Sequence, residues 1–261
     1  MSVIAILCIL AIVLSIIVFM VWASASIRSG VYVRAFCGEK TDRKVVYLTF
    51  DDGPHPPETE RVLDVLREHG ARATFFLIGS KISGNEAVLR RMLEEGHALG
   101  LHTYSHAGTF PLMSFDKMLA DVNEGKRAVE SVAGKKISLF RPPFGVTNPT
   151  IAKVVRTLRL QTVGWNVRSF DTMFCKSSEH SCKQSGYSCK QSGHDWYVPV
   201  VERIMKQVRP GSVILLHDRL DEASELLALL LDSLVASGYD FTRALPNTLI
   251  SSSDSSETNL S

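Results

Sequence analysis

The hydrophobic pattern divides the chain into an apolar N-terminal segment and a longer region in which strand-like and helix-like patterns alternate. Residues 3–25 are almost purely apolar, and the first charged side chain is Arg28. About 20 apolar residues suffice to cross a bilayer as a helix. Residues 23–25, Ala-Ser-Ala, resemble a signal-peptide cleavage site, but no Lys or Arg precedes the segment and it is long for a signal core. We therefore expect residues 1–27 to be a retained transmembrane anchor, with a signal segment as the alternative.

Beyond this segment, short apolar runs typical of buried strands alternate with apolar positions at helical spacing. The predicted strands cover residues 45–50, 73–78, 97–101, 137–140, 161–165 and 213–217. One predicted helix begins at Pro56 and Pro57 and ends at His69, before Gly70. A second ends before Gly96, and a third follows an N-cap at Ser114. Further helices cover residues 147–158, 198–208 and 223–236. Alternation of this kind indicates an α/β protein with a parallel sheet, either open or closed into a barrel.

The length of the chain fits one such domain. Residues 43–246 suit a single α/β barrel, and residues 28–42 are expected to be a linker. The Ser-rich residues 247–261 cannot bury a core and are expected to be a disordered tail. The net charge of +2 and the lack of a basic stripe interleaved with aromatic residues argue against nucleic-acid binding.

Residues 175–195 contain a tandem heptapeptide whose copies start at Cys175, Cys182 and Cys189. The repeat has almost no apolar residues, so its period of seven does not indicate a coiled coil. We interpret it as a duplicated surface insertion. A Cys-rich metal or disulfide loop, with Cys37 as a further partner, is the alternative.

Chemically reactive side chains follow the ends of the predicted strands. They are Asp51, Asp52, His102, His106, Arg141, Asp171 and His217. Ligands bind at the C-terminal ends of the strands in parallel sheets and barrels, so one barrel mouth would bring these residues together. Neighbouring side chains of a strand point to opposite faces, so Asp51 and Asp52 need not share a role.

His102 and His106 have the spacing of a metal-binding pair. They are four residues apart, and one helical turn would place both imidazoles on the same face. Together with one carboxylate they form a set of two His and one Asp, which suits zinc with an open position for water. A water bound at such a site can ionise near neutral pH and attack a carbonyl.

Four motifs carry a resemblance to a known family. They are Thr-Phe-Asp-Asp-Gly-Pro at 49–54, His-Thr-Tyr-Ser-His at 102–106, Arg-Pro-Pro-Phe-Gly at 141–145 and Leu-Leu-His-Asp at 215–218. In this order they resemble the polysaccharide deacetylases of the NodB-homology type, carbohydrate esterase family 4. The resemblance implies a distorted (β/α) barrel of about seven strands. It also implies removal of N-acetyl groups from amino sugars with a divalent metal, usually zinc.

The resemblance further implies a role for each motif residue. Asp52, His102 and His106 would bind the metal, Asp51 would be the general base, and His217 would be the general acid. Arg141 would pair with Asp51 and hold it ionised, and the backbone N–H of Phe144 would help stabilise the oxyanion. The residues expected to contact the sugar and its acetyl group are Pro143, Phe144, Trp165 and Leu215.

A further motif departs from the family pattern Asp-x-x-Asp-Trp. Here Arg168 stands at the first Asp and Thr172 at the Trp, whereas Asp171 is retained. The resemblance implies that Asp171 forms a hydrogen bond to the catalytic His217. The missing Trp removes a wall of the usual polymer groove, so the departure concerns the sugar subsite and leaves the chemistry intact.

These observations predict a membrane-anchored, zinc-dependent deacetylase of N-acetylated cell-envelope glycans, with no protein partner indicated. Family members mostly act outside the cytoplasmic membrane, which favours an extracytoplasmic domain. The basic residues that follow the apolar segment favour the opposite orientation. A cytoplasmic-face deacetylase or deformylase of a lipid-linked amino sugar is therefore the alternative. An inactive carbohydrate-binding homologue is disfavoured because the base, the ligands and the acid are all present.

Overall fold

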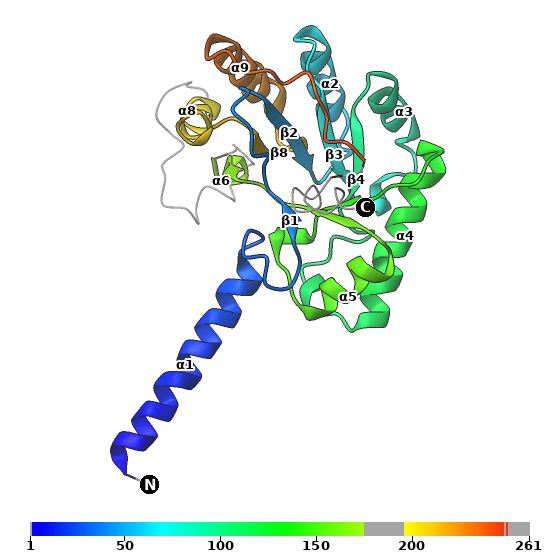
Figure 1. Ribbon diagram of the computed structural model, residues 1–261. Helices are drawn as coiled ribbons and strands as arrows, with labels where there is room; N and C mark the ends of the chain where they lie inside the picture. Colours follow the sequence, from blue (N-terminus) through cyan, green and yellow to red (C-terminus); the bar gives the residue numbers. More distant parts are fainter. Residues whose placement is uncertain (1, 175–195, 248, 250–261) are drawn as a thin grey trace, which may run out of the picture.

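The computed structural model describes residues 2–174, 196–247 and 249. The predicted heptapeptide insertion and residues 250–261 of the predicted tail lie outside this part. Within it, the strands form one parallel sheet in the order β1-β6-β5-β4-β3-β2-β8-β7 (Figure 1). The strands are β1 Ala35–Phe36, β2 Val46–Asp51, β3 Ala73–Leu77, β4 Ala98–Leu101, β5 Leu139–Phe140, β6 Gln161–Val163, β7 Val167–Arg168 and β8 Ser212–His217.

Helices surround this sheet on its outer side, as Figure 1 shows. They are α2 Glu58–Glu68, α3 Glu86–Glu94, α4 Phe115–Ala133, α5 Pro149–Thr157, α6 Asp171–Phe174, α8 Tyr197–Gln207 and α9 Ala223–Ala236, with short 3₁₀ turns at η1 Gly79–Lys81, η2 Phe110–Leu112 and η3 Pro143–Gly145. Helix α1, Val3–Ala25, lies apart from them (Figure 1). The predicted α/β class is confirmed.

The sheet is curled into an open barrel. Strands β6 and β7 lie towards opposite ends of the strand order, yet only residues 164–166 separate them in the sequence. A chain this short spans at most about 15 Å, so the two ends of the sheet must approach each other. An isolated bridge between Gly38 and Ser212 also links the chain after β1 to β8.

Alternation along the central strands separates an outer core from an inner one. Val46, Leu48 and Phe50 of β2 pack in the large cluster that includes the helices, whereas Tyr47 belongs to a smaller inner cluster. Because side chains alternate along a strand, Asp51 lies on the same inner face as Tyr47. The strand therefore delivers Asp51 to the interior of the barrel at its C-terminal mouth.

Helix α1 extends away from the rest of the molecule (Figure 1), and its apolar side chains are exposed. It is long and apolar enough to cross a membrane. Its C-terminal end joins the domain: Ala23 and Ile27 are buried, and the Ser24 carbonyl accepts a hydrogen bond from the Thr147 N–H at 3.0 Å.

The structure differs from the sequence-based expectations mainly in its shortest elements. The sheet has eight strands where about seven were expected, because β1 and β7 have two residues each, too few to show an alternating pattern. Strand β1 lies within residues 28–42, so part of the expected linker belongs to the sheet. The predicted strand 161–165 ends at Val163. At the C-terminus, the Leu249 N–H donates to the Gln161 side chain at 2.7 Å, so the start of the expected tail contacts the sheet.

Candidate active site

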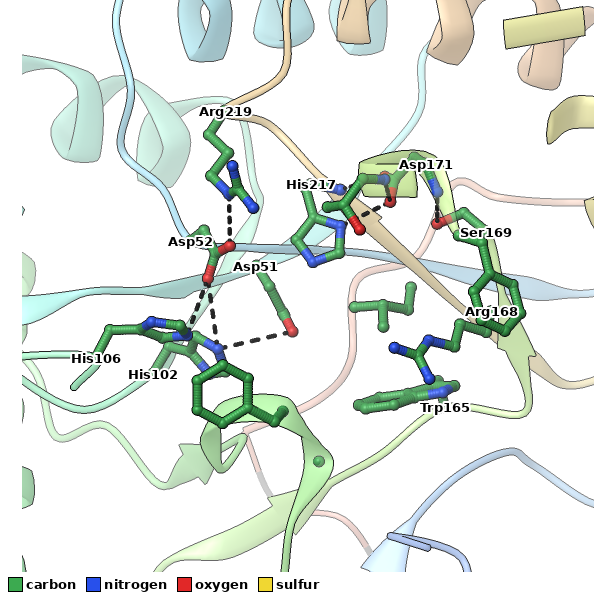
Figure 2. A pocket seen from close by; sticks show the side chains of 15 residues that line it. Asp51, Asp52, His102, His106, Trp165, Arg168, Ser169, Asp171, His217 and Arg219 are labelled. Atoms are coloured by element: carbon green, nitrogen blue, oxygen red, sulfur yellow. Dashed lines mark hydrogen bonds and ion pairs between the residues drawn. The ribbon is translucent and has the colours of Figure 1, made fainter. Parts of the chain in front are cut away.

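A pocket opens at the C-terminal ends of the strands (Figure 2), and the polar residues predicted from the sequence, except the buried Arg141, line it. The register explains part of this arrangement: Asp51 of β2 lies directly beside His217 of β8. The pocket is lined by Asp51, Asp52, His102, His106, Phe144, Gly145, Trp165, Arg168, Ser169, Phe170, Asp171, Thr172, Leu215, His217 and Arg219.

Asp52, His102 and His106 form a compact set of metal-ligand atoms. One ligand atom from each lies within 4.8 Å of the others. The Asp52 Oδ1 atom is 3.3 Å from Nε2 of His106 and 3.6 Å from Nε2 of His102. One carboxylate and two imidazoles are the donor set expected for a catalytic zinc site. The residues present therefore fit a divalent metal.

Two further features suit this role. Nδ1 of His102 lies 2.6 Å from the Arg141 carbonyl oxygen, which can only accept, so Nδ1 carries the proton and Nε2 presents its lone pair to the site. Burial and the neighbouring His102 lower the pKa of His106, which favours the neutral imidazole that binds metals.

The two histidines do not lie on a helical turn, so that expectation was wrong. His102 follows β4 in a loop, and the backbone of Thr103 and His106 is left-handed, with φ of 66° and 48°. The Thr103 hydroxyl accepts the His106 N–H at 3.0 Å and holds this loop. The loop still brings the two rings together, with centroids 4.8 Å apart.

Arg219 is a site residue that the sequence analysis missed. Its Nε donates to Oδ2 of Asp52 at 2.7 Å, so one carboxylate oxygen faces the histidines and the other faces Arg219. Burial by itself raises the pKa of Asp52, but His102, His217 and the hydrogen bond from Arg219 outweigh it and lower the pKa to about 2. The only sequence signal was the position of Arg219, two residues after His217.

Arg141 is fully buried and pairs with Asp51. Its Nη1 donates to Oδ1 of Asp51 at 2.7 Å and to the Thr49 hydroxyl at 2.9 Å. Its Nε donates to the Val163 carbonyl and its Nη2 to the Gly164 carbonyl. A buried guanidinium is tolerated only when its donors and its charge are satisfied. The expected pairing with Asp51 is therefore present, and the other oxygen of Asp51, Oδ2, lies at the pocket 4.0 Å from Nε2 of His102.

His217 is held by Asp171 at two points. The carboxylate accepts from Nδ1 of His217 at 2.8 Å and from its backbone N–H at 2.9 Å. Burial lowers the pKa of His217, but the charge and hydrogen bond of Asp171, with smaller effects from Asp51 and Asp52, raise it to about 9. With Nδ1 occupied, the imidazole can offer Nε2 to the pocket.

Apolar side chains form the remaining walls. Phe144, Trp165 and Leu215 line the pocket, whereas Pro143 is buried and is not among the lining residues. Their expected contacts with the sugar stay a prediction. Phe144 is 54% exposed, and its ring meets that of His106 edge-on at 5.3 Å. A Cβ at Gly145 would lie 2.4 Å from the Trp165 ring, so only glycine allows this loop to approach Trp165.

Asp218 lies next to the site but below its surface. It is fully buried, Oδ2 accepts from the Thr59 hydroxyl at 2.7 Å, and Oδ1 has no partner within the described residues. A Cβ at Gly53 would lie 2.3 Å from Oδ2, so this carboxyl packs directly against the turn after Asp52. Burial, with a smaller effect from Asp52, raises the pKa of Asp218 to about 7.

Comparisons with known proteins point in one direction. Residues 38–163 match the family model described as polysaccharide deacetylase. The chain is 33% identical over 207 residues to a peptidoglycan-N-acetylglucosamine deacetylase of Bacillus cereus, covering 77% of this chain and 86% of the relative. It is 32% identical over 178 residues to a chitooligosaccharide deacetylase of Azorhizobium caulinodans, covering 66% and 73% of the two chains. Among solved structures, a family 4 carbohydrate esterase from Streptomyces lividans in complex with acetate superposes with a TM-score of 0.62 at 27% identity, covering 76% of this chain and 92% of the other.

Proposed function

The chain belongs to the polysaccharide deacetylases of carbohydrate esterase family 4, which are amide hydrolases. We propose that it is a zinc-dependent deacetylase of cell-envelope amino-sugar glycans, anchored to the membrane by α1. Its substrates are N-acetylated glycans such as peptidoglycan or chitooligosaccharides. The observation that carries the proposal is the meeting of the Asp52, His102 and His106 set with Asp51 and His217 in one pocket.

The metal is held by Asp52, His102 and His106 in this proposal. Two imidazoles and one carboxylate favour zinc among the common divalent ions. A divalent cation at this place supplies Lewis acidity, which polarises the acetamido carbonyl and makes water more acidic. Metal analysis of the purified wild type and of His106→Ala tests the assignment. Full metal occupancy in His106→Ala would contradict it.

Asp51 and His217 divide the proton transfers between them. Oδ1 of Asp51 is occupied by Arg141, so Oδ2 accepts a proton from the water that attacks the acetyl carbonyl carbon. Nδ1 of His217 is occupied by Asp171, so Nε2 donates a proton to the sugar nitrogen as the carbon–nitrogen bond breaks. A pKa of about 9 keeps His217 protonated at neutral pH, as a general acid requires. The products are acetate and the free amino sugar.

The pocket walls hold the acetamido group between these two residues. Phe144 and Leu215 border the acetyl methyl, Trp165 borders the sugar, and the backbone N–H of Phe144 donates to the oxyanion of the tetrahedral intermediate.

We propose that the barrel lies outside the cytoplasmic membrane and that α1 is the anchor. The exposed apolar surface of α1 supports insertion of this helix into lipid. Protease added to intact cells should then digest the domain, and washing membranes with carbonate should not release it. Protection of the domain until the membrane is opened would instead favour a lipid-linked amino sugar at the cytoplasmic face.

The activity is tested by mass spectrometry of products from a panel of N-acetylated glycans. The panel includes peptidoglycan fragments and chitooligosaccharides, incubated with the full-length protein in detergent and zinc. We expect loss of acetyl groups and release of acetate, both abolished in Asp51→Asn. Intact acetyl groups on every glycan with metal-loaded protein would overturn the proposed function.

A further inference from the structure

One wall of the pocket carries a positive charge, from Arg168, that the reaction described above does not use. Arg168 ends β7 and lies in register with Leu215 of β8. Because alternate side chains along β8 share a face, Arg168 faces the same side of the sheet as Leu215 and His217. It is exposed and lines the pocket. Figure 2 shows its guanidinium lying over the Trp165 ring and reaching towards the pocket.

Two aromatic rings hold the guanidinium in place. Its central carbon lies 4.6 Å from the centroid of the Phe170 ring and 6.0 Å from that of Trp165. Contacts of this kind act on the faces of the guanidinium plane, so they leave the N–H groups at its edges available. The side chain is therefore oriented before any ligand arrives, which reduces the entropy lost on binding.

Arg168 differs in its pairing from the other charged groups of the pocket. Each carboxylate there has a cationic partner: Asp51 with Arg141, Asp52 with Arg219, and Asp171 with His217. Within the described residues, Arg168 has no carboxylate within ion-pair distance. Among the described residues that line the pocket, Arg168 is therefore a cation that no carboxylate neutralises.

We infer that Arg168 selects amino sugars that carry a carboxylate beside the acetamido group, as N-acetylmuramic acid does, over neutral N-acetylglucosamine. The inference rests on the proposed function and names the substrate class of the same pocket. A substituent on the ring carbon next to the acetamido-bearing carbon necessarily lies close to the reacting amide. The fork of guanidinium N–H groups matches the two oxygens of a carboxylate. An Asp at this position, as in the family pattern, would repel the same group.

The test compares two substrates that differ at one substituent, which is charged in one and neutral in the other. One is an oligosaccharide containing N-acetylmuramic acid, and the other is the same oligosaccharide with the carboxylate converted to its methyl amide. The wild-type full-length protein should show a kcat/KM at least tenfold higher for the acid than for the amide. This ratio should fall towards one in Arg168→Gln and should be partly restored in Arg168→Lys, which keeps the charge and loses the fork.

Arg203 supplies the matched control. Its guanidinium also lies near the Phe170 ring, at 5.6 Å, but it does not line the pocket. Arg203→Gln should therefore keep the wild-type ratio, although it removes the same charge. A ratio that falls equally in both variants would show a general field effect and would overturn the assignment.

The outcomes separate this inference from the proposed function. If chitooligosaccharides and both oligosaccharides are deacetylated but the wild-type ratio is near one, the function stands and the role of Arg168 is refuted. A preference for a phosphate-bearing amino sugar over the carboxylate would also refute the carboxylate assignment. Absence of deacetylation on every glycan would refute the function itself.

Discussion

Asp171→Asn tests the acid–base assignment most directly, because it removes one charge and keeps a similar shape. Asp171 accounts for the two largest effects that raise the pKa of His217, from an ordinary 6.5 to about 9. That rise corresponds to about 3 kcal/mol in favour of the imidazolium, at roughly 1.4 kcal/mol per pH unit. Asn can accept from only one of the two His217 N–H groups that Asp171 now holds. We expect the pKa of His217 to return towards its ordinary value.

The consequence is a shift in the pH profile of kcat/KM. His217 must be protonated to donate, so the alkaline limb of the profile reports its pKa. At pH 8, a pKa of about 9 leaves roughly 90% of His217 protonated, whereas a full return to 6.5 leaves roughly 3%. The variant should therefore lose up to about thirtyfold in rate at pH 8 through protonation alone, and less at lower pH. The acid limb, which depends on Asp51, should stay in place.

The assay is acetate release across the pH range, together with an NMR titration of the His217 ring in the same proteins. Asp116→Asn, which removes an exposed carboxylate of α4 outside the pocket, is the control and should leave both limbs unchanged. An alkaline limb that stays near its wild-type position in Asp171→Asn would refute the reasoning. So would a shift of the acid limb alone.

Three further perturbations test other parts of the site. Asp52→Asn should lose bound metal whereas Asp51→Asn should keep it and lose activity; metal analysis decides, and the reverse pattern would exchange the two roles. Arg141→Gln should lower the free energy of unfolding, measured with urea, by about 3–5 kcal/mol, because it leaves the buried carboxylate of Asp51 unpaired. The double variant that also carries Asp51→Asn should recover part of this loss. An equal loss in the single and double variants would show that the charge of Asp51 is not the cause. Since the pKa of buried Asp218 rises from 3.8 to about 7, its protonated form favours folding, and this contribution is lost as pH rises from 3.8 to 7. The free energy of unfolding should therefore decline by up to about 4 kcal/mol between pH 4 and 8 in the wild type, and Asp218→Asn should remove this decline. An unchanged dependence of the free energy of unfolding on pH in the variant would contradict the assignment.

Much of the fold and the site could be predicted from the sequence because the signals are local. The six predicted strands are all present, with shifted ends. Three of them contain four apolar residues in a row, at residues 45–48, 75–78 and 213–216, and such runs are typical of buried strands. The motif residues lie at the C-terminal ends of strands or shortly after them, and parallel strands bring these ends to one mouth. The pairs Asp51–Arg141 and Asp171–His217 followed from the family resemblance, and both are present.

Tertiary structure decided what local patterns do not contain. The two-residue strands β1 and β7 exist only because longer neighbours offer them partners. His102 and His106 meet through a left-handed loop and not through helical spacing. The pairing of Arg219 with Asp52 and the position of Arg168 on the pocket wall depend on the register of β8 with its neighbours. A sequence fixes which side chains follow a strand, but the distance between charges on different strands is set by how the strands pair and curl.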